Sequence, residues 1–317
     1  MKNLFIFLFI ISSIFGCKPN NTLTSNLNQE ASNNSKSDPC TINCKDDDKS
    51  SPWNFYANFE DNSWKAKLTP NDKGRGWGPY KIIEENGNKF LSITVKSGWN
   101  RARGSRGQPT ERSELQTSKR KTYGKEVWYG FKIKKPEETE LIFDRLLINQ
   151  FKQMARNGKV SPLIKIFQRV PDKSLVSMHI CGMIGGPGYR IMGPNLLGSE
   201  KYSHEVNFYC GDKLLEGNYT FQNKDIFDQL FSADWKNVVF GTYVINNEQG
   251  FIKIYINKKL VFDYKGPTYG WSNIVGSYVR IGPYRNGKRY GKHPPQTFYY
   301  DDFVIGSKDD VTKVLWK

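Results

Sequence analysis

The residues Phe251-Ile-Lys-Ile-Tyr-Ile256 alternate, so that the three isoleucines share one face of an extended chain. Asn257-Lys258 suits a tight turn, and Leu260-Val-Phe-Asp-Tyr264 continues as a second strand. We therefore expect a β-hairpin with one buried face over residues 251–264.

Short runs of the same kind recur along the chain, separated by Gly, Pro and Asn. They are Leu91–Val95, Val127–Ile133, Lys236–Ile245 and Phe298–Ile305. Helical periodicity is nearly absent, and the best candidate, Lys224–Phe231, is short. This pattern predicts one all-β domain over residues 51–317, folded as a β-jelly roll or sandwich of two antiparallel sheets.

The composition is that of a globular protein, with 317 residues, 38% of them apolar and 25% charged. The net charge is +16. Residues 1–50 hold five lysines and five acidic residues, so the whole net charge lies in residues 51–317. A surface this basic favours a polyanion as partner: nucleic acid, anionic lipid or an acidic polysaccharide.

The N-terminus narrows that choice. Lys2 and the apolar run Leu4–Phe15 predict a secretory signal over residues 1–16. Ser13-Ile-Phe-Gly-Cys17 resembles a bacterial lipobox, which implies lipidation of Cys17, and Lys18 favours the outer membrane. The alternative is an ordinary signal peptide with an incidental cysteine. Residues 17–50 are polar and predict a flexible tether. A lipid anchor in the bacterial cell envelope makes nucleic acid an unsuitable partner.

Four further cysteines fit an oxidising compartment. The obvious pairing is Cys40–Cys44 and Cys181–Cys210, although four cysteines allow three pairings. A zinc site is disfavoured because the spacing matches no usual finger and the three histidines are scattered.

Two cation clusters stand out in the domain. Residues 101–121, with Arg103 and Arg106, hold seven cations and two anions. Residues 280–293, with Lys288, Tyr290 and His293, hold five cations and no acid. Most such cations belong to solvated loops, but arginine interleaved with Gly and Tyr suits bidentate recognition of carboxylate or sulfate. We expect these residues to line a groove for a uronic-acid chain.

The segments Glu111–Leu115, Leu147–Lys152 and Arg280–Arg285 carry a resemblance. They resemble polysaccharide lyases with a β-jelly-roll fold, of the heparin lyase and glucuronan lyase group. Glu111-Arg-Ser-Glu-Leu115 resembles their Arg-Thr/Ser-Glu-Leu strand. Leu147-Ile-Asn-Gln-Phe-Lys152 is similar to a strand ending Gln-Trp-His, and Arg280-Ile-Gly-Pro-Tyr-Arg285 to Lys-Phe-Gly-Ile-Tyr-Arg. Trp128–Phe131, Ser161–Ile164, Trp235–Val261 and Tyr299–Gly306 fit further segments in the same order. The resemblance implies a concanavalin A-like sandwich.

The resemblance also implies β-elimination, which needs a group to neutralise the uronate carboxylate, a base for the C5 proton and an acid for the leaving oxygen. Tyr284 matches the catalytic tyrosine of the family. Gln150 and Arg112 match positions that bind or neutralise the carboxylate, and Arg280 matches a lysine that contacts substrate. Arg285 is expected to contact substrate as well. If residues 112–117 form a strand, Glu114 shares a face with Arg112 and Gln116 and supports a neighbouring arginine within the groove.

One position departs from the family pattern, because Lys152 stands where the family has histidine. A lysine serves as base only if its pKa falls, which a cationic groove favours. Otherwise Lys152 is a charge clamp and Tyr284 is both base and acid, which is the interpretation we favour. His179 and His204 are alternative bases.

Two other functions remain open on the sequence. A jelly roll also serves non-catalytic proteins that bind anionic polysaccharide. A glycoside hydrolase needs a pair of carboxylates, for which Asp301-Asp302 is the only candidate near a site segment. The resemblance implies no required cofactor and leaves room for a structural Ca²⁺. We expect a monomer.

Overall fold

The computed structural model describes most of the predicted domain. The described residues are 53–71, 77–99, 102–103, 109–142, 145–155, 160–170, 173–180, 189–193, 203–210, 213–268, 274–287 and 292–317. Cys17, Cys40, Cys44, Arg106, Cys181, Lys288 and Tyr290 lie outside these ranges, as do the side chains of Arg103, His179, His204 and Cys210. The expectations for these residues therefore stay predictions.

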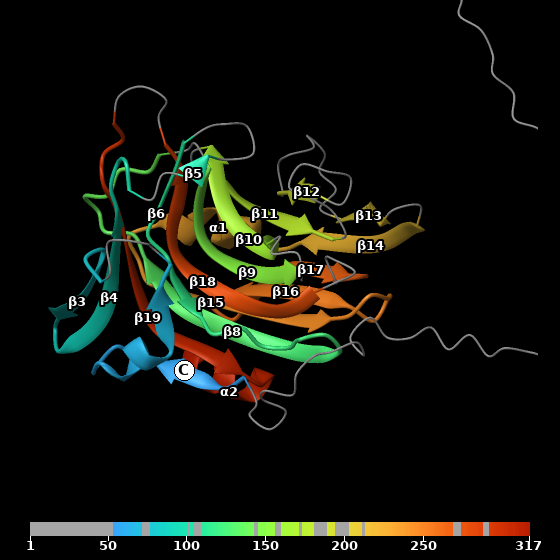
Figure 1. The fold of residues 1–317 in the computed structure, drawn as a ribbon, viewed down its shortest axis with the longest axis horizontal. Helices are drawn as coiled ribbons and strands as arrows, with labels where there is room; N and C mark the ends of the chain where they lie inside the picture. The colour runs from blue at the N-terminus through green and yellow to red at the C-terminus, as the bar shows by residue number, and fades with distance from the viewer. Residues whose placement is uncertain are drawn as a thin grey trace, which may run out of the picture. The chain divides into compact units, whose positions relative to one another are not determined.

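Two antiparallel sheets face one another across the core (Figure 1). Within the described residues, the larger sheet has ten strands in the order β13-β14-β17-β16-β15-β8-β19-β4-β3, and β1 pairs with β19. Its strands are β1 (Phe55–Ala57), β3 (Tyr80–Glu85), β4 (Asn88–Val95), β8 (Lys125–Lys134), β13 (Ser203–Cys210), β14 (Lys213–Phe221), β15 (Lys236–Val244), β16 (Phe251–Ile256), β17 (Lys259–Lys265) and β19 (Gln296–Gly306). The all-β sandwich is thereby confirmed.

The smaller sheet carries most of the family-like segments. In the part of the chain that the structure describes, it has nine strands in the order β12-β11-β10-β9-β18-β6-β5, and β7 pairs with both β18 and β2. Its strands are β2 (Leu68–Pro70), β5 (Ala102–Arg103), β6 (Pro109–Arg112), β7 (Leu115–Thr117), β9 (Leu146–Ala155), β10 (Val160–Val170), β11 (Lys173–His179), β12 (Tyr189–Met192) and β18 (Ile274–Asn286).

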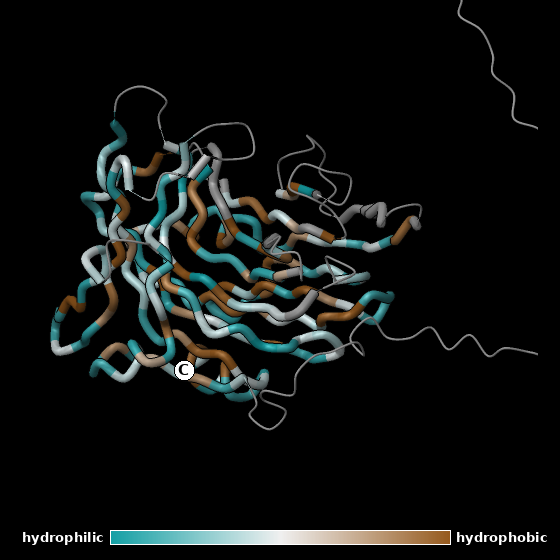
Figure 2. Tube along the Cα trace, in the orientation of Figure 1, coloured by the Kyte–Doolittle hydropathy of each residue, from teal (hydrophilic) through white to brown (hydrophobic). Residues whose placement is uncertain are grey.

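The hairpin of β16 and β17 forms as predicted. Asn257 and Lys258 both have positive φ, 48° and 69°, which a two-residue hairpin turn with the right twist requires. All three isoleucines of β16 are fully buried in the core between the sheets. Along the strands, hydrophobic residues alternate with hydrophilic ones (Figure 2), as expected when one face is buried.

Helices are few among the described residues. The predicted helix is α1 (Lys224–Asp228), followed by a 3₁₀ turn, η2 (Gln229–Phe231), and another 3₁₀ turn, η1 (Ser63–Ala66), precedes β2. The sequence reasoning missed α2 (Lys308–Leu315), which packs on the outer face of the larger sheet (Figure 1). Its signal was the capping box of Ser307 and Asp310. No helix in the described ranges is long and apolar enough to cross a membrane.

The expected strand over 112–117 is wrong, because the chain leaves the sheet at Ser113 and Glu114. The carbonyl oxygen of Glu114 accepts hydrogen bonds from the Asn71 backbone N–H and the Tyr80 hydroxyl, both at 2.8 Å. Gly282, with a φ of 121°, lies against this break, where an added Cβ would come within 2.2 Å of the Ser113 carbonyl oxygen. Only glycine allows that approach.

Candidate active site

The family-like residues gather on the outer face of the smaller sheet, where β7, β18 and β9 lie side by side. On β18, Val279 and Ile281 are fully buried in the core, so Tyr278 and Arg280 point to the opposite face. In the antiparallel register Arg280 lies between Gln116 of β7 and Gln150 of β9, and Tyr278 lies opposite Lys152. Strand alternation and register therefore bring together residues that are far apart in sequence.

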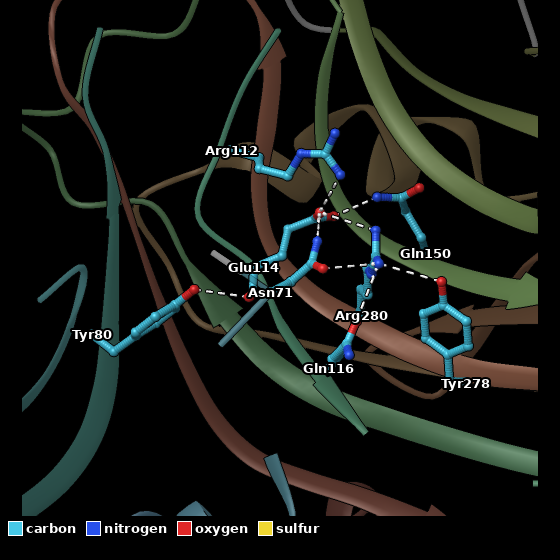
Figure 3. Close-up of polar contacts among 8 residues, drawn as sticks. All are labelled: Asn71, Tyr80, Arg112, Glu114, Gln116, Gln150, Tyr278 and Arg280. Atoms are coloured by element: carbon cyan, nitrogen blue, oxygen red, sulfur yellow. Dashed lines mark hydrogen bonds and ion pairs between the residues drawn. The ribbon is translucent and has the colours of Figure 1, made fainter. Parts of the chain in front are cut away.

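Glu114 is the centre of this cluster (Figure 3). Its side chain is only 1% exposed. The carboxylate accepts hydrogen bonds from the amides of Gln150 and, at 3.4 Å, Asn71. Arg280 and Arg112 approach it at 3.7 Å and 3.9 Å. Glu114 therefore contacts two arginines, and its supporting role within a substrate groove stays a prediction. A buried carboxylate with so many donors is a fixed anchor rather than a free group.

Arg280 is held in one orientation by four partners. Besides Glu114, its terminal nitrogen donates to Asn71 at 3.0 Å, Gln116 at 3.1 Å and the Tyr278 hydroxyl at 3.3 Å. The residue is 9% exposed. Its positive charge therefore lies beneath the surface of the site, from where it affects neighbouring groups such as Lys152 by electrostatic repulsion or attraction.

Above this buried layer lies a more accessible one. Arg112, Arg145, Lys152 and Tyr284 are half-buried. The guanidinium carbons of Arg112 and Arg145 lie 4.9 Å and 5.2 Å from the centre of the Tyr284 ring, within cation–π range. Tyr284 also contacts a small apolar cluster formed by Leu147 and Leu175. The phenol is thus positioned by two cations and an apolar support.

Lys152 shows a strong electrostatic perturbation. Burial, followed by the charge of Arg280, lowers its pKa from 10.5 to about 7. Arg112 and Arg145 act in the same direction, whereas Glu114 opposes them. Near pH 7, Lys152 therefore exists in part as the neutral amine, which can accept a proton.

Arg285 does not belong to this site, and the expectation that it contacts substrate is wrong. It is fully buried, and its Nε lies 2.9 Å from a Glu111 carboxylate oxygen. It also donates to Gln296 at 3.0 Å and to the carbonyl of Pro294 at 2.7 Å. Tyr284 faces outward, so the next residue along the strand faces inward. His293, half-buried, lies in the segment before β19.

Some members of the cluster had not been identified from the sequence. Arg145 lies just before β9 in no recognisable motif, and Asn71 and Tyr80 come from other segments. Tyr278 could have been found, since it lies two residues before Arg280 on one strand and therefore on the same face.

Other chemistries lack support in the described part of the chain. Glu114 is the only carboxylate recorded in contact with the described residues of the cluster. Asp301 and Asp302 lie on β19 of the larger sheet and cannot complete a hydrolase pair there. No group of three or more His, Cys, Asp or Glu suited to a metal ion occurs among the described residues.

Comparisons with known proteins agree with the fold. A family model described as polysaccharide lyase matches residues 80–304. The endo-β-1,4-glucuronan lyase from the fungus Trichoderma reesei has a TM-score of 0.53 and 15% identity, over 82% of this chain and 97% of its own. An alginate lyase from Pseudomonas aeruginosa has a TM-score of 0.47 and 12% identity, over 76% and 97%. At 15% identity the likeness to the glucuronan lyase shows the fold alone. No curated protein matched the chain.

Proposed function

The chain belongs to the polysaccharide lyase family, and on that premise we propose that it cleaves a uronic-acid-containing polysaccharide by β-elimination. One observation carries the proposal. A buried carboxylate, Glu114, anchors Arg112, Arg280 and Gln150 directly beside a lysine of lowered pKa. Three arginines, counting Arg145, surround one acid, so the site favours an anionic ligand.

The first requirement of the reaction is neutralisation of the uronate carboxylate. Arg112 is the best placed group, because its side chain is 19% exposed and is directed by Glu114. Arg145 is a second group that can neutralise the carboxylate, since it lies over the same tyrosine ring, that of Tyr284. A guanidinium fork can bind both carboxylate oxygens and so stabilise the charge that develops when the C5 proton leaves. Gln150 contributes the second hydrogen of its amide, the first being donated to Glu114.

The second requirement is a base. We assign Lys152 this role in its neutral form, and so depart from our sequence interpretation of a charge clamp. The amine takes the C5 proton, the electron pair of that C–H bond forms the C4=C5 double bond, and the C4–O4 bond breaks. The lowered pKa of about 7 supports the assignment, because an ordinary lysine is protonated at neutral pH.

The third requirement is an acid, and Tyr284 fills it. Its hydroxyl gives a proton to the departing O4, and the two guanidinium groups over its ring hold the phenol in place. Lys152 and Tyr284 thus divide the two proton transfers. No metal ion is needed in these steps.

The decisive experiment is an ultraviolet scan for unsaturated products. The purified 51–317 domain is incubated with glucuronan, alginate, heparan sulfate, chondroitin sulfate, hyaluronan and pectate, the first two because the structural neighbours act on them. Rising absorbance on one polymer supports the proposal and identifies the substrate class. A flat trace on every polymer contradicts it, and new reducing ends without absorbance would indicate hydrolysis.

A variant pair tests the acid. Tyr284→Phe should abolish product while leaving oligosaccharide binding intact. Tyr299→Phe, a matched change on the larger sheet, should be neutral. Equal loss of binding and turnover in Tyr284→Phe would contradict the assignment and favour a packing role.

A further inference from the structure

A cavity lies on the outer face of the larger sheet, away from the candidate active site. Its volume is about 460 Å³, and its lining includes Trp128 of β8, Phe251, Lys253 and Tyr255 of β16, and Lys308 of α2. The alternate residues of β16 are buried in the core between the sheets, so these side chains point to the opposite face. The size falls within the range of small-molecule sites.

The floor of this cavity is a fixed aromatic platform. The Trp128 ring lies across Gly241, where an added Cβ would be 2.6 Å from ring atoms, and the indole N–H donates to Glu126. Trp128 is only 3% exposed. The rings of Phe251 and Tyr255 pack on it with centroids 6.4 Å and 6.2 Å away, and both remain half-exposed. A rigid pair of accessible rings suits the apolar C–H face of a sugar.

The rim supplies positive charge. Lys265 and Lys308 are exposed, and within the described residues neither forms an ion pair with a carboxylate. The Lys308 ammonium lies 5.4 Å from the centre of the Trp128 ring, at the edge of the platform. Lys253 is paired with Asp263 at 3.8 Å. Of the two acids in the lining, Glu126 already accepts the indole N–H, and Glu248 lies exposed in the turn before β16. Two lysines are therefore available to an incoming carboxylate.

We propose that this cavity is a second saccharide-binding site, which takes a uronate residue of an acidic polysaccharide. The sugar ring lies on Phe251 and Tyr255, and its carboxylate reaches Lys265 and Lys308. The choice of polymer rests on the proposed function, but the binding itself does not require catalysis. A second attachment point raises the effective concentration of a long chain at the groove, whereas a short oligosaccharide gains nothing from it.

The test is affinity electrophoresis in gels containing glucuronan or alginate, with dextran as the neutral control. All proteins carry Tyr284→Phe so that the polymer stays intact. The Lys265→Glu/Lys308→Glu variant should bind the acidic polymer about tenfold more weakly. Phe251→Leu, which keeps apolar volume but removes the flat ring, should also weaken binding. The control Lys81→Glu/Lys259→Glu makes the same change in net charge at exposed sites outside the cavity.

The outcomes separate this inference from the proposed function. If Lys265→Glu/Lys308→Glu and the control Lys81→Glu/Lys259→Glu weaken polymer binding equally, the attraction is non-specific and the site is overturned. Unchanged binding in a correctly folded Phe251→Leu variant would also overturn it. Without Tyr284→Phe, the cavity variant should lose turnover on long polymer but keep it on a short oligosaccharide. Loss of both would also overturn the site. If no polymer yields unsaturated product yet the cavity variants alone lose binding, the proposed reaction fails and the site stands.

Discussion

Replacing Lys152 by arginine separates a base from a charge clamp. Arginine keeps the positive charge but stays protonated at any pH the protein tolerates. With a pKa of about 7, roughly half of the Lys152 side chains are neutral at pH 7. A lysine with an ordinary pKa would be neutral in only about one molecule in 3,000. If Lys152 is the base, Lys152→Arg should lower kcat by about 10²- to 10⁴-fold.

The assay is the initial rate of unsaturated product formation, followed by absorbance between about pH 5 and 9. Because the neutral amine is the active form, the wild-type kcat/KM should rise with pH and level off above about 7. Arg280 is the largest charge effect on that pKa after burial. Arg280→Gln should therefore raise the pKa of Lys152 and move the rise in rate to higher pH.

A clear result would refute this reasoning. If Lys152→Arg keeps most of its activity, Lys152 acts as a clamp and Tyr284 must serve as both base and acid. Lys134→Arg, on the larger sheet, controls for the substitution itself, and far-ultraviolet circular dichroism checks the fold. Lys152→His, which restores the histidine of the family pattern, should recover part of the activity lost in Lys152→Arg.

Three further predictions concern groups around the site. Arg285→Met leaves the buried Glu111 carboxylate without its ion-pair partner, so the free energy of unfolding, measured with denaturant, should fall by about 4 kcal/mol. A raised KM without that loss of stability would restore a substrate role for Arg285. Burial raises the pKa of Asp301 to about 6, so the stability of the native protein falls as the pH rises from about 4 to 6. Asp301→Asn should therefore raise the melting temperature at pH 8 but not at pH 4. An equal rise in melting temperature at both pH values would contradict this. Gly282→Ala places a Cβ against the Ser113 carbonyl oxygen and should displace Glu114, so kcat should fall about a hundredfold. An unchanged kcat would show that the backbone at Ser113 and Glu114 shifts without disturbing the site.

Much of the fold followed from local pattern. The β16–β17 hairpin, β4, β8, β15 and β19 were all predicted close to their observed bounds, because alternation and turn residues act over a few neighbouring positions. The C-terminal helix α2 was missed since it has only eight residues, too few for its periodicity to stand out.

The site was predictable only in part. The motifs around Arg112, Gln150 and Tyr284 pointed to the correct strands. Arg145, by contrast, reaches Tyr284 from the end of a loop, and no local pattern marks it. The expected strand over 112–117 failed because a distant glycine and Asn71 draw the chain out of the sheet.

The sequence by itself determined the class of fold, the family and the polar residue types of the site. Only the tertiary structure decided what each charged group does. Arg280 and Arg285 are nearly adjacent and chemically identical, yet Arg280 joins the Glu114 cluster and Arg285 is buried against Glu111. The same holds for Lys152, whose pKa is lowered by burial and by three arginines, two of them from other strands. Alternation is a short-range property of the chain, whereas burial and charge proximity depend on strand register across the sheet.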